Sequence, residues 1–332
     1  MINYDSAAGP FAHSENSSVR IMYRVIASLL PALLVGIYHF GINGLSMVMV
    51  CCLVAVISEY LCLKLMGRDC RACIDGSALL TALLLAMSLP PTVPLWLCAV
   101  GTVFAIVVGK QIYGGLGQNL FNPAMLARVM LLICFPLEMS QWAEPTPIGF
   151  TLDQINIPGN WLLFDGVSAA TVLGESSVTP SLGSLALGSH AGSLGETSAI
   201  LILLGGVYLI YRRIIHWAIP VSFIAGLALP ALISSTLAPS DYLSMPEHLL
   251  SGGAMLCAFY IATDLVTSPS TVKGQLIYGA GCGALVWLIR SYGSYPEGVA
   301  FAVLLLNAIS PLIDHYVRPN LFGSQVTKEG VK

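Results

Sequence analysis

Long apolar runs recur through this chain and restrict it to one class of fold. From about Ile21 to Tyr316 the sequence is a series of hydrophobic stretches, many of the length needed to cross a lipid bilayer. Charged residues make up only 9 % of the chain, against about a quarter in soluble domains. Because backbone groups inside a bilayer must be hydrogen-bonded within the segment, such runs form helices. The sequence therefore predicts an all-α polytopic membrane protein.

Ten crossing segments are predicted, five on each side of one long polar loop. Their ranges are Met22–Phe40, Leu45–Leu65, Ser77–Leu89, Val93–Val108, Asn122–Pro136, Thr197–Tyr211, Trp217–Leu237, Leu250–Leu265, Gln275–Ile289 and Gly298–Tyr316. The third, at ~13 residues and 1.5 Å per residue, spans only ~20 Å of a ~30 Å hydrocarbon core. An even number of crossings places both termini on the same side of the membrane.

The basic residues indicate which side that is. Twelve of the fourteen Lys and Arg fall on the two tails or on the loops predicted to lie on the same side of the membrane as the tails. Only Arg128 and Arg290 do not. Basic residues stay on the cytoplasmic side, so both termini are expected inside and the long loop outside. The polar first twenty residues lack the features of a cleaved signal peptide, so the first apolar segment is expected to remain as a helix.

This topology divides the chain into five parts. They are a cytoplasmic tail (1–20), transmembrane helices one to five (21–136), a periplasmic loop (137–196), helices six to ten (197–316) and a second cytoplasmic tail (317–332).

A faint internal repeat relates the two halves. The third and eighth segments both begin on small residues and end in a hydroxyl-and-proline stop, at Ser88–Pro91 and Thr267–Pro269. Five crossings per half would make the repeat inverted, as in many transporters, where short interrupted segments point to a site at the membrane midplane. Asn122 would cap the fifth segment, with Pro123 in its first turn. Alternatively, these prolines simply end helices of a packed bundle.

The cysteines and histidines do not indicate a metal site. Cys70 and Cys73 form a lone CxxC, whereas zinc and iron–sulfur sites need about four ligands. We interpret this pair as reduced cytosolic thiols. No basic stretch interleaved with aromatic residues suggests nucleic-acid binding.

Three ionisable residues fall inside or at the end of apolar segments. They are Glu59, Arg128 and Asp264. A charge within a bilayer costs roughly 2.5–3.5 kcal/mol even on insertion scales, which makes such residues functional candidates. Glu59 and Asp264 are candidates for an ion path. The structural alternatives are an ion pair for Arg128 and a helix-end acid at the membrane interface for Asp264.

The long loop carries the most specific motif, Asp165-Gly-Val-Ser-Ala-Ala-Thr-Val-Leu173. This run resembles the flavinylation signature, Asp-x-x-Ser-(small)-Ala-Thr, of Rnf-type redox-driven ion pumps and sodium-pumping NADH:quinone reductases. The membrane layout is similar to that of the family formed by the D-type membrane subunits of the Rnf ion-translocating oxidoreductase complexes and the related B-type membrane subunits of the quinone reductases. Val172 departs from the proline of many relatives but removes no reactive atom. Without the resemblance, the alternative interpretation is a Ser/Thr-rich surface loop with no group attached to it.

The resemblance implies a redox function. Thr171 would hold FMN through a phosphoester, and Asp165 and Ser168 would be recognised by the attaching flavin transferase. The family implies a bacterial inner-membrane complex that couples ferredoxin and NAD to Na⁺ or H⁺ movement, with partner membrane and flavoprotein subunits and a non-covalent riboflavin in the bundle. Trp161 and Phe164 are near enough in sequence to stack on the flavin, or they anchor the loop at the interface.

Two other functions remain open from the sequence. The two-half repeat is similar to urea-transporter-like folds, so a small-solute channel or transporter without a redox cofactor is the main alternative. A structural scaffold for partner subunits is a third. Flavin content distinguishes the first function from both others, and solute flux without a redox donor would favour the second.

Overall fold

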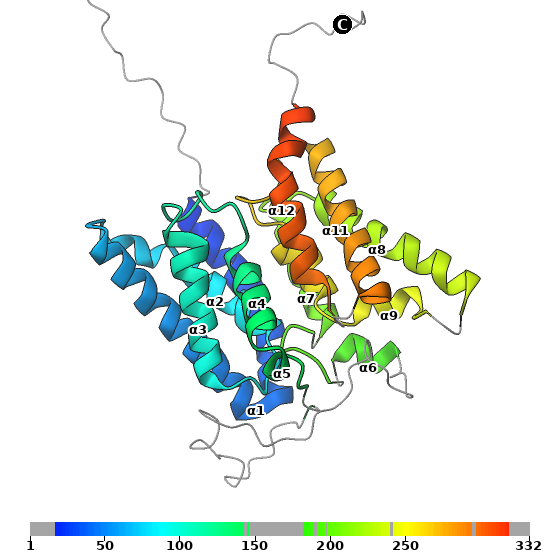
Figure 1. The fold of residues 1–332 in the computed structure, drawn as a ribbon, viewed down its shortest axis with the longest axis horizontal. Helices are drawn as coiled ribbons and strands as arrows, with labels where there is room; N and C mark the ends of the chain where they lie inside the picture. The colour runs from blue at the N-terminus through cyan, green and yellow to red at the C-terminus, as the bar shows by residue number, and fades with distance from the viewer. Residues whose placement is uncertain are drawn as a thin grey trace, which may run out of the picture.

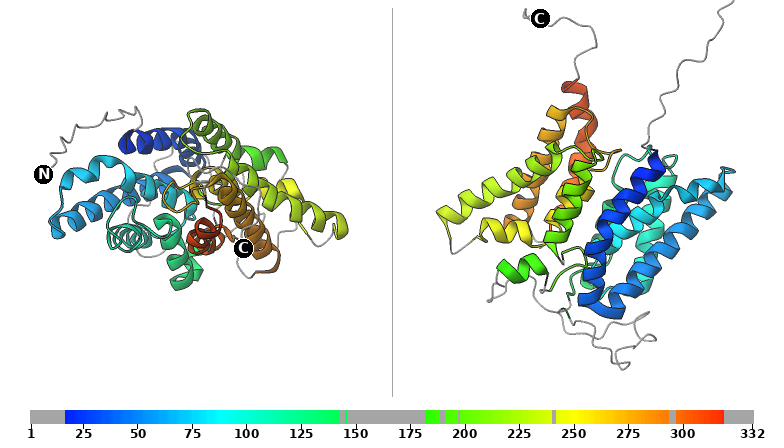
Figure 2. Two further views of the ribbon diagram at one scale, coloured as in Figure 1. Left: turned by 90° about the horizontal axis from the view of Figure 1, so that it is seen from above. Right: turned by 180° about the vertical axis from the view of Figure 1, so that it is seen from behind.

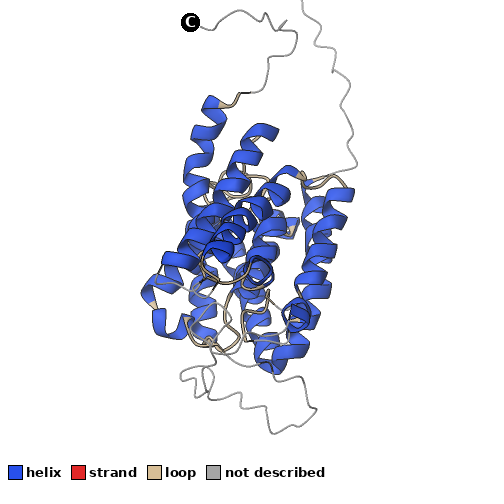
Figure 3. Cartoon of the chain, turned by 90° about the vertical axis from the view of Figure 1, so that its right-hand side faces the viewer, coloured by secondary structure: helices blue, strands red, loops and turns tan. Residues whose placement is uncertain are grey.

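The described part of the chain is built of helices and connecting loops. The computed structural model describes residues 17–142, 145, 182–188, 191–196, 198–239, 242–293 and 297–318, and every regular element within them is helical (Figure 3). The predicted all-α class is therefore confirmed. The elements are α1 (Ser18–Leu65), η1 (Cys70–Asp75), α2 (Ser77–Ser88), α3 (Leu95–Ile106), η2 (Val107–Gln111), α4 (Pro123–Cys134), α5 (Pro136–Met139), α6 (Leu182–Leu187), α7 (Ala199–Tyr211), α8 (Ala218–Leu237), α9 (Met245–Leu250), α10 (Ala254–Leu256), η4 (Cys257–Ile261), α11 (Val272–Tyr292) and α12 (Val299–Tyr316).

Among the described residues, four helices are long and apolar enough to cross a membrane: α1, α8, α11 and α12. Shorter apolar helices occupy the ranges 77–88, 95–111, 123–134 and 199–211. The first two predicted segments are the two arms of α1, which folds back at Gly41, a residue with φ of 62° and ψ of −143°. Only glycine adopts such a backbone conformation without strain, so the break lies where the sequence supplies one.

Two predicted ranges differ from the structure. In the predicted segment Leu250–Leu265, Leu250 is the last residue of α9 and a new helical stretch runs from Ala254 to Ile261. Gly252, with φ of 64°, separates the two. The predicted loop 137–196 contains the short helix α6, and its last described stretch, 191–196, is buried. This stretch is anchored by a hydrogen bond of 2.6 Å from the Gly195 amide to the Met87 carbonyl.

The helices form two groups that lie side by side (Figure 1). Elements before residue 140 make one group and elements after residue 181 the other, with α1 packed on α7 and α4 on α12. The start of α1 and the end of α12 lie at one edge of the molecule, and α5 and α6 lie at the opposite edge (Figures 1 and 2). This arrangement agrees with an even number of crossings, whereas the inverted relation of the halves remains a prediction.

Glycines allow the closest helix packing in the second group. α11 carries Gly279 and Gly283, four residues apart, on its contact with α8. A Cβ atom at Gly283 would lie 2.2 Å from the Phe223 carbonyl oxygen, and one at Gly226 of α8 would lie 2.3 Å from the Ala280 oxygen. Backbone-to-backbone packing through small residues is the usual way in which membrane helices associate, because lipid offers no hydrophobic driving force between them.

Candidate functional site

A pocket lies between the two helix groups, near the edge where α1 begins. Its empty space is about 770 Å³, a figure that includes the open solvent at its mouth. Its wall is largely apolar, with contributions such as Leu84 of α2 and Phe259 of η4. The polar side chains that line it come from both groups: Ser77, Thr81, Lys110, Asn119, Asn122, Tyr260, Thr263 and Asp264.

The two short segments that the sequence singled out both line this pocket. α2 contributes Ser77 and Thr81, and the Ala254–Ile261 segment with the turn after it contributes Tyr260 and Asp264. Two π-helical turns border the pocket, η2 in the first group and η4 in the second. π-Helical turns are rare and occur frequently at functional sites because they redirect side chains out of the regular helical pattern.

Asn122 connects the two groups at the pocket wall. Its side-chain oxygen accepts hydrogen bonds from the amides of Ala124 (3.1 Å) and Met125 (3.3 Å), which confirms the predicted cap of α4 with Pro123 in the first turn. Its side-chain nitrogen donates to the Ile261 carbonyl in η4, at 3.4 Å. The amino-terminal end of α4, with its partial positive charge, therefore borders the pocket.

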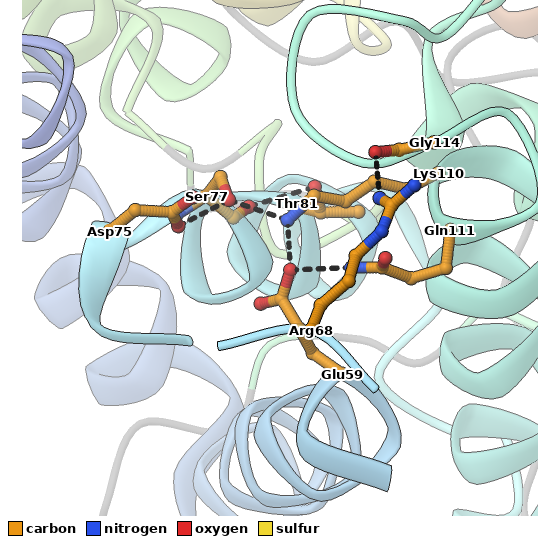
Figure 4. Close-up of polar contacts among 8 residues, drawn as sticks. All are labelled: Glu59, Arg68, Asp75, Ser77, Thr81, Lys110, Gln111 and Gly114. Carbon is orange, nitrogen blue, oxygen red and sulfur yellow. Dashed lines mark hydrogen bonds and ion pairs between the residues drawn. The ribbon is translucent and has the colours of Figure 1, made fainter. Parts of the chain in front are cut away.

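A buried polar network (Figure 4) includes two of the lining residues, Ser77 and Lys110. The ammonium of Lys110 forms an ion pair with Glu59 Oε1 and lies 2.5 Å from Ser77 Oγ. The Gln111 amide donates to the same Glu59 oxygen at 2.9 Å. The side chains of Glu59 and Lys110 are only 3 % and 4 % exposed. Asp75 accepts from the amide and hydroxyl of Ser77 and thereby holds that residue in place.

Two acceptor atoms of this network have no partner among the described residues. They are Glu59 Oε2 and Gln111 Oε1, both buried. A buried acceptor left without a donor costs roughly 1–3 kcal/mol, more for a charged group. The network therefore combines one satisfied ion pair with two oxygens that remain able to accept a hydrogen bond or contact a cation.

Asp264 lines the same pocket from the second helix group. Its carboxylate accepts hydrogen bonds from the Val266 amide (3.3 Å) and the Thr267 hydroxyl (3.2 Å), in the turn after η4. Asp264 lines the pocket directly, whereas Glu59 approaches it only through Lys110. The structure therefore places both predicted ion-path acids around one pocket without bringing them into contact.

A second buried charge cluster lies away from the pocket. Arg128 of α4 forms an ion pair with Glu297, just before α12, and Glu297 also accepts from the Gly253 amide at 2.6 Å. Arg290 donates to the carbonyls of His248 (2.6 Å) and Ser251 (3.1 Å). Arg128 thus has the structural ion pair that the sequence suggested as its alternative role. Arg128 and Arg290 are the two basic residues that depart from the charge pattern of the sequence. Each binds buried acceptors, which explains why an arginine is tolerated at these positions.

Sequence reasoning missed several residues of these sites. Lys110 was assigned to a cytoplasmic loop, but it is 3 % exposed in η2. Glu297, the partner of Arg128, was not singled out, although an arginine within an apolar segment demands a nearby acid. The predicted flavinylation residues Asp165, Ser168 and Thr171, and the aromatic candidates Trp161 and Phe164, lie outside the described residues.

Comparison with known proteins matches nearly the whole chain. Residues 5–323 match the NQR2, RnfD, RnfE family. A protein of Stutzerimonas stutzeri, named as the D-type subunit of an ion-translocating oxidoreductase complex, is 47 % identical, over 92 % of this chain and 92 % of its own length. Proteins of the same name from Halorhodospira halophila and Yersinia pseudotuberculosis are 43 % and 44 % identical, covering 95 % and 96 % of this chain and 94 % and 97 % of their own.

Proposed function

The chain belongs to the NQR2, RnfD, RnfE family, and from that premise we propose that it is the flavin-carrying membrane subunit of a redox-driven ion pump. As a member of this family it is a membrane subunit of an ion-translocating oxidoreductase complex. The observation that carries the proposal is the motif from Asp165 to Leu173, which stands within a family match that covers residues 5–323.

Thr171 is the proposed attachment point, through a phosphoester between its hydroxyl oxygen and FMN. Asp165 and Ser168 are the proposed recognition residues for the flavin transferase. A bound flavin would supply one-electron transfer, while the protein supplies position and electrostatics. A covalent link replaces binding affinity with a high local concentration, so the cofactor is not lost from a loop that faces an open compartment.

The proposed arrangement in the membrane follows from the charge pattern. Ten crossings in two inverted halves, with tails 1–20 and 317–332 in the cytoplasm and loop 137–196 in the periplasm, would place the flavin on the outer face of the bacterial inner membrane. The positions of the start of α1 and the end of α12 at one edge support this arrangement. A partner flavoprotein would deliver the electron at the outer face.

The pocket between the helix groups is the proposed site of the non-covalent riboflavin. The residues that line it suit a flavin, which needs apolar walls for its ring and polar partners for its edges. Leu84 and Phe259 provide apolar wall, and Thr81, Asn119 and Asn122 provide polar groups. These residues would bind and orient the ring and exclude water from it.

Glu59 and Asp264 are the proposed members of an ion path. Asp264 offers a carboxylate at the pocket surface, and Glu59 has one buried oxygen without a partner among the described residues. A path for Na⁺ or H⁺ past this pocket would bring the ion close to a redox group, whose change of charge on reduction would alter the binding energy of the ion.

The decisive experiment is to replace Thr171 with alanine in protein co-expressed with a flavin transferase. Wild-type protein should give a fluorescent flavin band on a denaturing gel and an added FMN mass on the peptide from Asn160 to Glu175. Thr171→Ala should abolish both, and the matched control Thr179→Ala, a threonine of the same loop outside the motif, should keep both.

Retention of covalent flavin in Thr171→Ala would overturn the attachment site. Flavin-free wild-type protein that passes small solutes in liposomes without a redox donor would favour the channel function instead. Flavin-free protein that only supports assembly would favour the scaffold.

A further inference from the structure

A second cavity opens beside the proposed riboflavin pocket, at the same edge of the molecule. It encloses about 1,020 Å³ including open space, between the end of α7, the turn that leads into α8, the turn after η4 and the start of α11. The two cavities share wall residues, among them Ile214 and Thr263. The second cavity is more polar, and nothing in the proposed electron or ion path uses it.

The only permanently charged side chain on the described wall of this cavity is a cation. Arg213 lines it together with His216 and Ser268, and the described wall contains no Asp or Glu. The Arg213 guanidinium has no hydrogen-bond or ion-pair partner within the described ranges. The cavity therefore offers an uncompensated positive charge and a hydroxyl, which are the groups that bind a phosphate.

The backbone of Arg213 adopts a conformation that favours glycine. Its φ is 55°, and it directly follows Arg212, the cap residue of α7. Helices commonly end with a residue in this left-handed region, and that residue is usually glycine because a Cβ atom is strained there. An arginine at this position carries a strain that glycine would avoid, and in return it places its charge at the cavity.

The surroundings indicate an amphipathic ligand at the level of the lipid headgroups. Trp217, on the cavity wall, is 50 % exposed, and tryptophan is typical of the membrane–water interface. Apolar side chains continue away from the cavity along α8, where Val221 is 52 % exposed. By the charge pattern of the sequence this edge faces the cytoplasm. Basic pockets between helices on that side suit anionic lipid headgroups.

We propose that this cavity binds one anionic phospholipid of the inner leaflet, with Arg213 and Ser268 contacting its phosphate. Apolar side chains such as Ile210 and Leu265, the latter 54 % exposed, contact the first part of the acyl chains. This proposal rests on the predicted orientation of the chain but not on the flavin assignments, because no flavin-binding residue is needed to form the cavity wall named here.

The test measures lipid binding to the full-length delipidated protein by native mass spectrometry. The probes are dioleoyl phosphatidylglycerol, which is anionic, and dioleoyl phosphatidylcholine, which has no net charge. Wild type should bind one phosphatidylglycerol in preference to phosphatidylcholine. Arg213→Gln should bind it about fivefold more weakly, the ratio expected for one basic contact near a lipid surface. Arg212→Gln, which removes an equal charge from a neighbour off the cavity wall, should bind as wild type does.

Arg213→Gly separates lipid binding from folding. It removes the charge but relieves the left-handed strain, so it should melt at or above the wild-type temperature in detergent while losing the preference for phosphatidylglycerol. Equal binding of both lipids by wild type, or undiminished phosphatidylglycerol binding by Arg213→Gln, would overturn the proposal. Displacement of the lipid by an equal concentration of inorganic phosphate would also overturn it, because the site would then recognise a free anion.

Discussion

Arg128 of α4 and Glu297, which precedes α12, form a buried ion pair that ties the two helix groups together. Both side chains are 7 % exposed, and Glu297 gains a further hydrogen bond from the Gly253 amide. A pair of this kind contributes little beyond what apolar residues of equal volume would, but removing one partner leaves a buried charge uncompensated. Removing one partner should therefore weaken the contact between the groups.

Arg128→Gln should destabilise the protein by about 3–5 kcal/mol, because Glu297 would remain buried without its cation. The free energy of unfolding can be measured in detergent by denaturant titration. The control Arg212→Gln removes an exposed arginine and should change stability by no more than about 0.5 kcal/mol. If Arg128→Gln is as stable as the wild type, the Arg128–Glu297 ion pair does not contribute to the free energy of unfolding.

Glu196 should make stability depend on pH. It lies at the end of the predicted loop, where burial raises the pKa of its carboxyl from an ordinary 4.5 to about 7 and the Glu297 carboxylate adds to the rise. Hydrogen bonding from Ser193 and the charge of Arg128 act in the opposite direction. Because the folded pKa exceeds the unfolded one, the folded state holds an extra proton between about pH 4.5 and 7.

The contribution of Glu196 to stability is thus complete below about pH 4.5 and is lost as the pH rises to about 7. One proton corresponds to a slope of about 1.4 kcal/mol per pH unit within this window. Unfolding free energies of wild type and Glu196→Gln, measured from pH 5 upwards, should diverge in slope, with the glutamine variant the flatter. Parallel curves would rule out a perturbed Glu196, and Glu138→Gln serves as the control acid.

The Glu59–Lys110 pair allows the ion-path and structural roles of Glu59 to be separated. Glu59→Gln alone leaves Lys110 buried without an acid and should cost about 3–5 kcal/mol. The double variant Glu59→Gln/Lys110→Met removes both charges and should recover most of that stability. If Glu59 belongs to an ion path, the double variant will assemble and transfer electrons but will not move ions.

Asp264→Asn should likewise keep electron transfer and stop ion movement, since the amide cannot exchange a proton or neutralise a cation. Both activities are measured in proteoliposomes that contain the whole complex, with Glu138→Gln as the matched acid outside the path. Wild-type ion transport in the stable double variant would assign Glu59 a purely structural role. Wild-type ion transport in Asp264→Asn would remove Asp264 from the path.

Local patterns in the sequence predicted local features of the structure. The apolar runs located the helices because each helix satisfies its own backbone in lipid, and Asn122-Pro123 located the start of α4 because capping involves adjacent residues. The break at Gly41 falls in the gap between two predicted segments.

Contacts between distant residues could not be predicted in this way. Glu59 pairs with a lysine 51 positions away, and Arg128 with a glutamate 169 positions away. Helical spacing rules consider partners only three or four residues apart, so they could not identify Lys110 as the partner of Glu59. Lys110 is buried in the π-helical turn η2, which the hydropathy of the sequence cannot predict. Such a turn changes the direction of the side chains and not the residue composition.

The proposed riboflavin pocket can be tested by filling it. Thr81 of α2 lines the pocket and is 8 % exposed, so Thr81→Leu would place a larger apolar side chain where the flavin ring is expected. Overpacking of this kind costs about 1–3 kcal/mol, so the content of non-covalent flavin should fall about fivefold or more. Flavin attached at Thr171 should be unaffected, because the proposed covalent link does not depend on binding in the pocket.

Acid treatment distinguishes the two flavins, since it releases the non-covalent flavin and leaves the phosphoester-linked flavin on the protein. Thr236→Leu, the same change at an exposed position of α8 off the pocket wall, should retain both. Loss of both flavins in Thr81→Leu would indicate a folding defect that reaches the loop, and its melting temperature would then fall with the flavin content. Full retention of acid-released flavin in a stable Thr81→Leu protein would place the riboflavin elsewhere, because a leucine at that position and a flavin ring cannot share the same space.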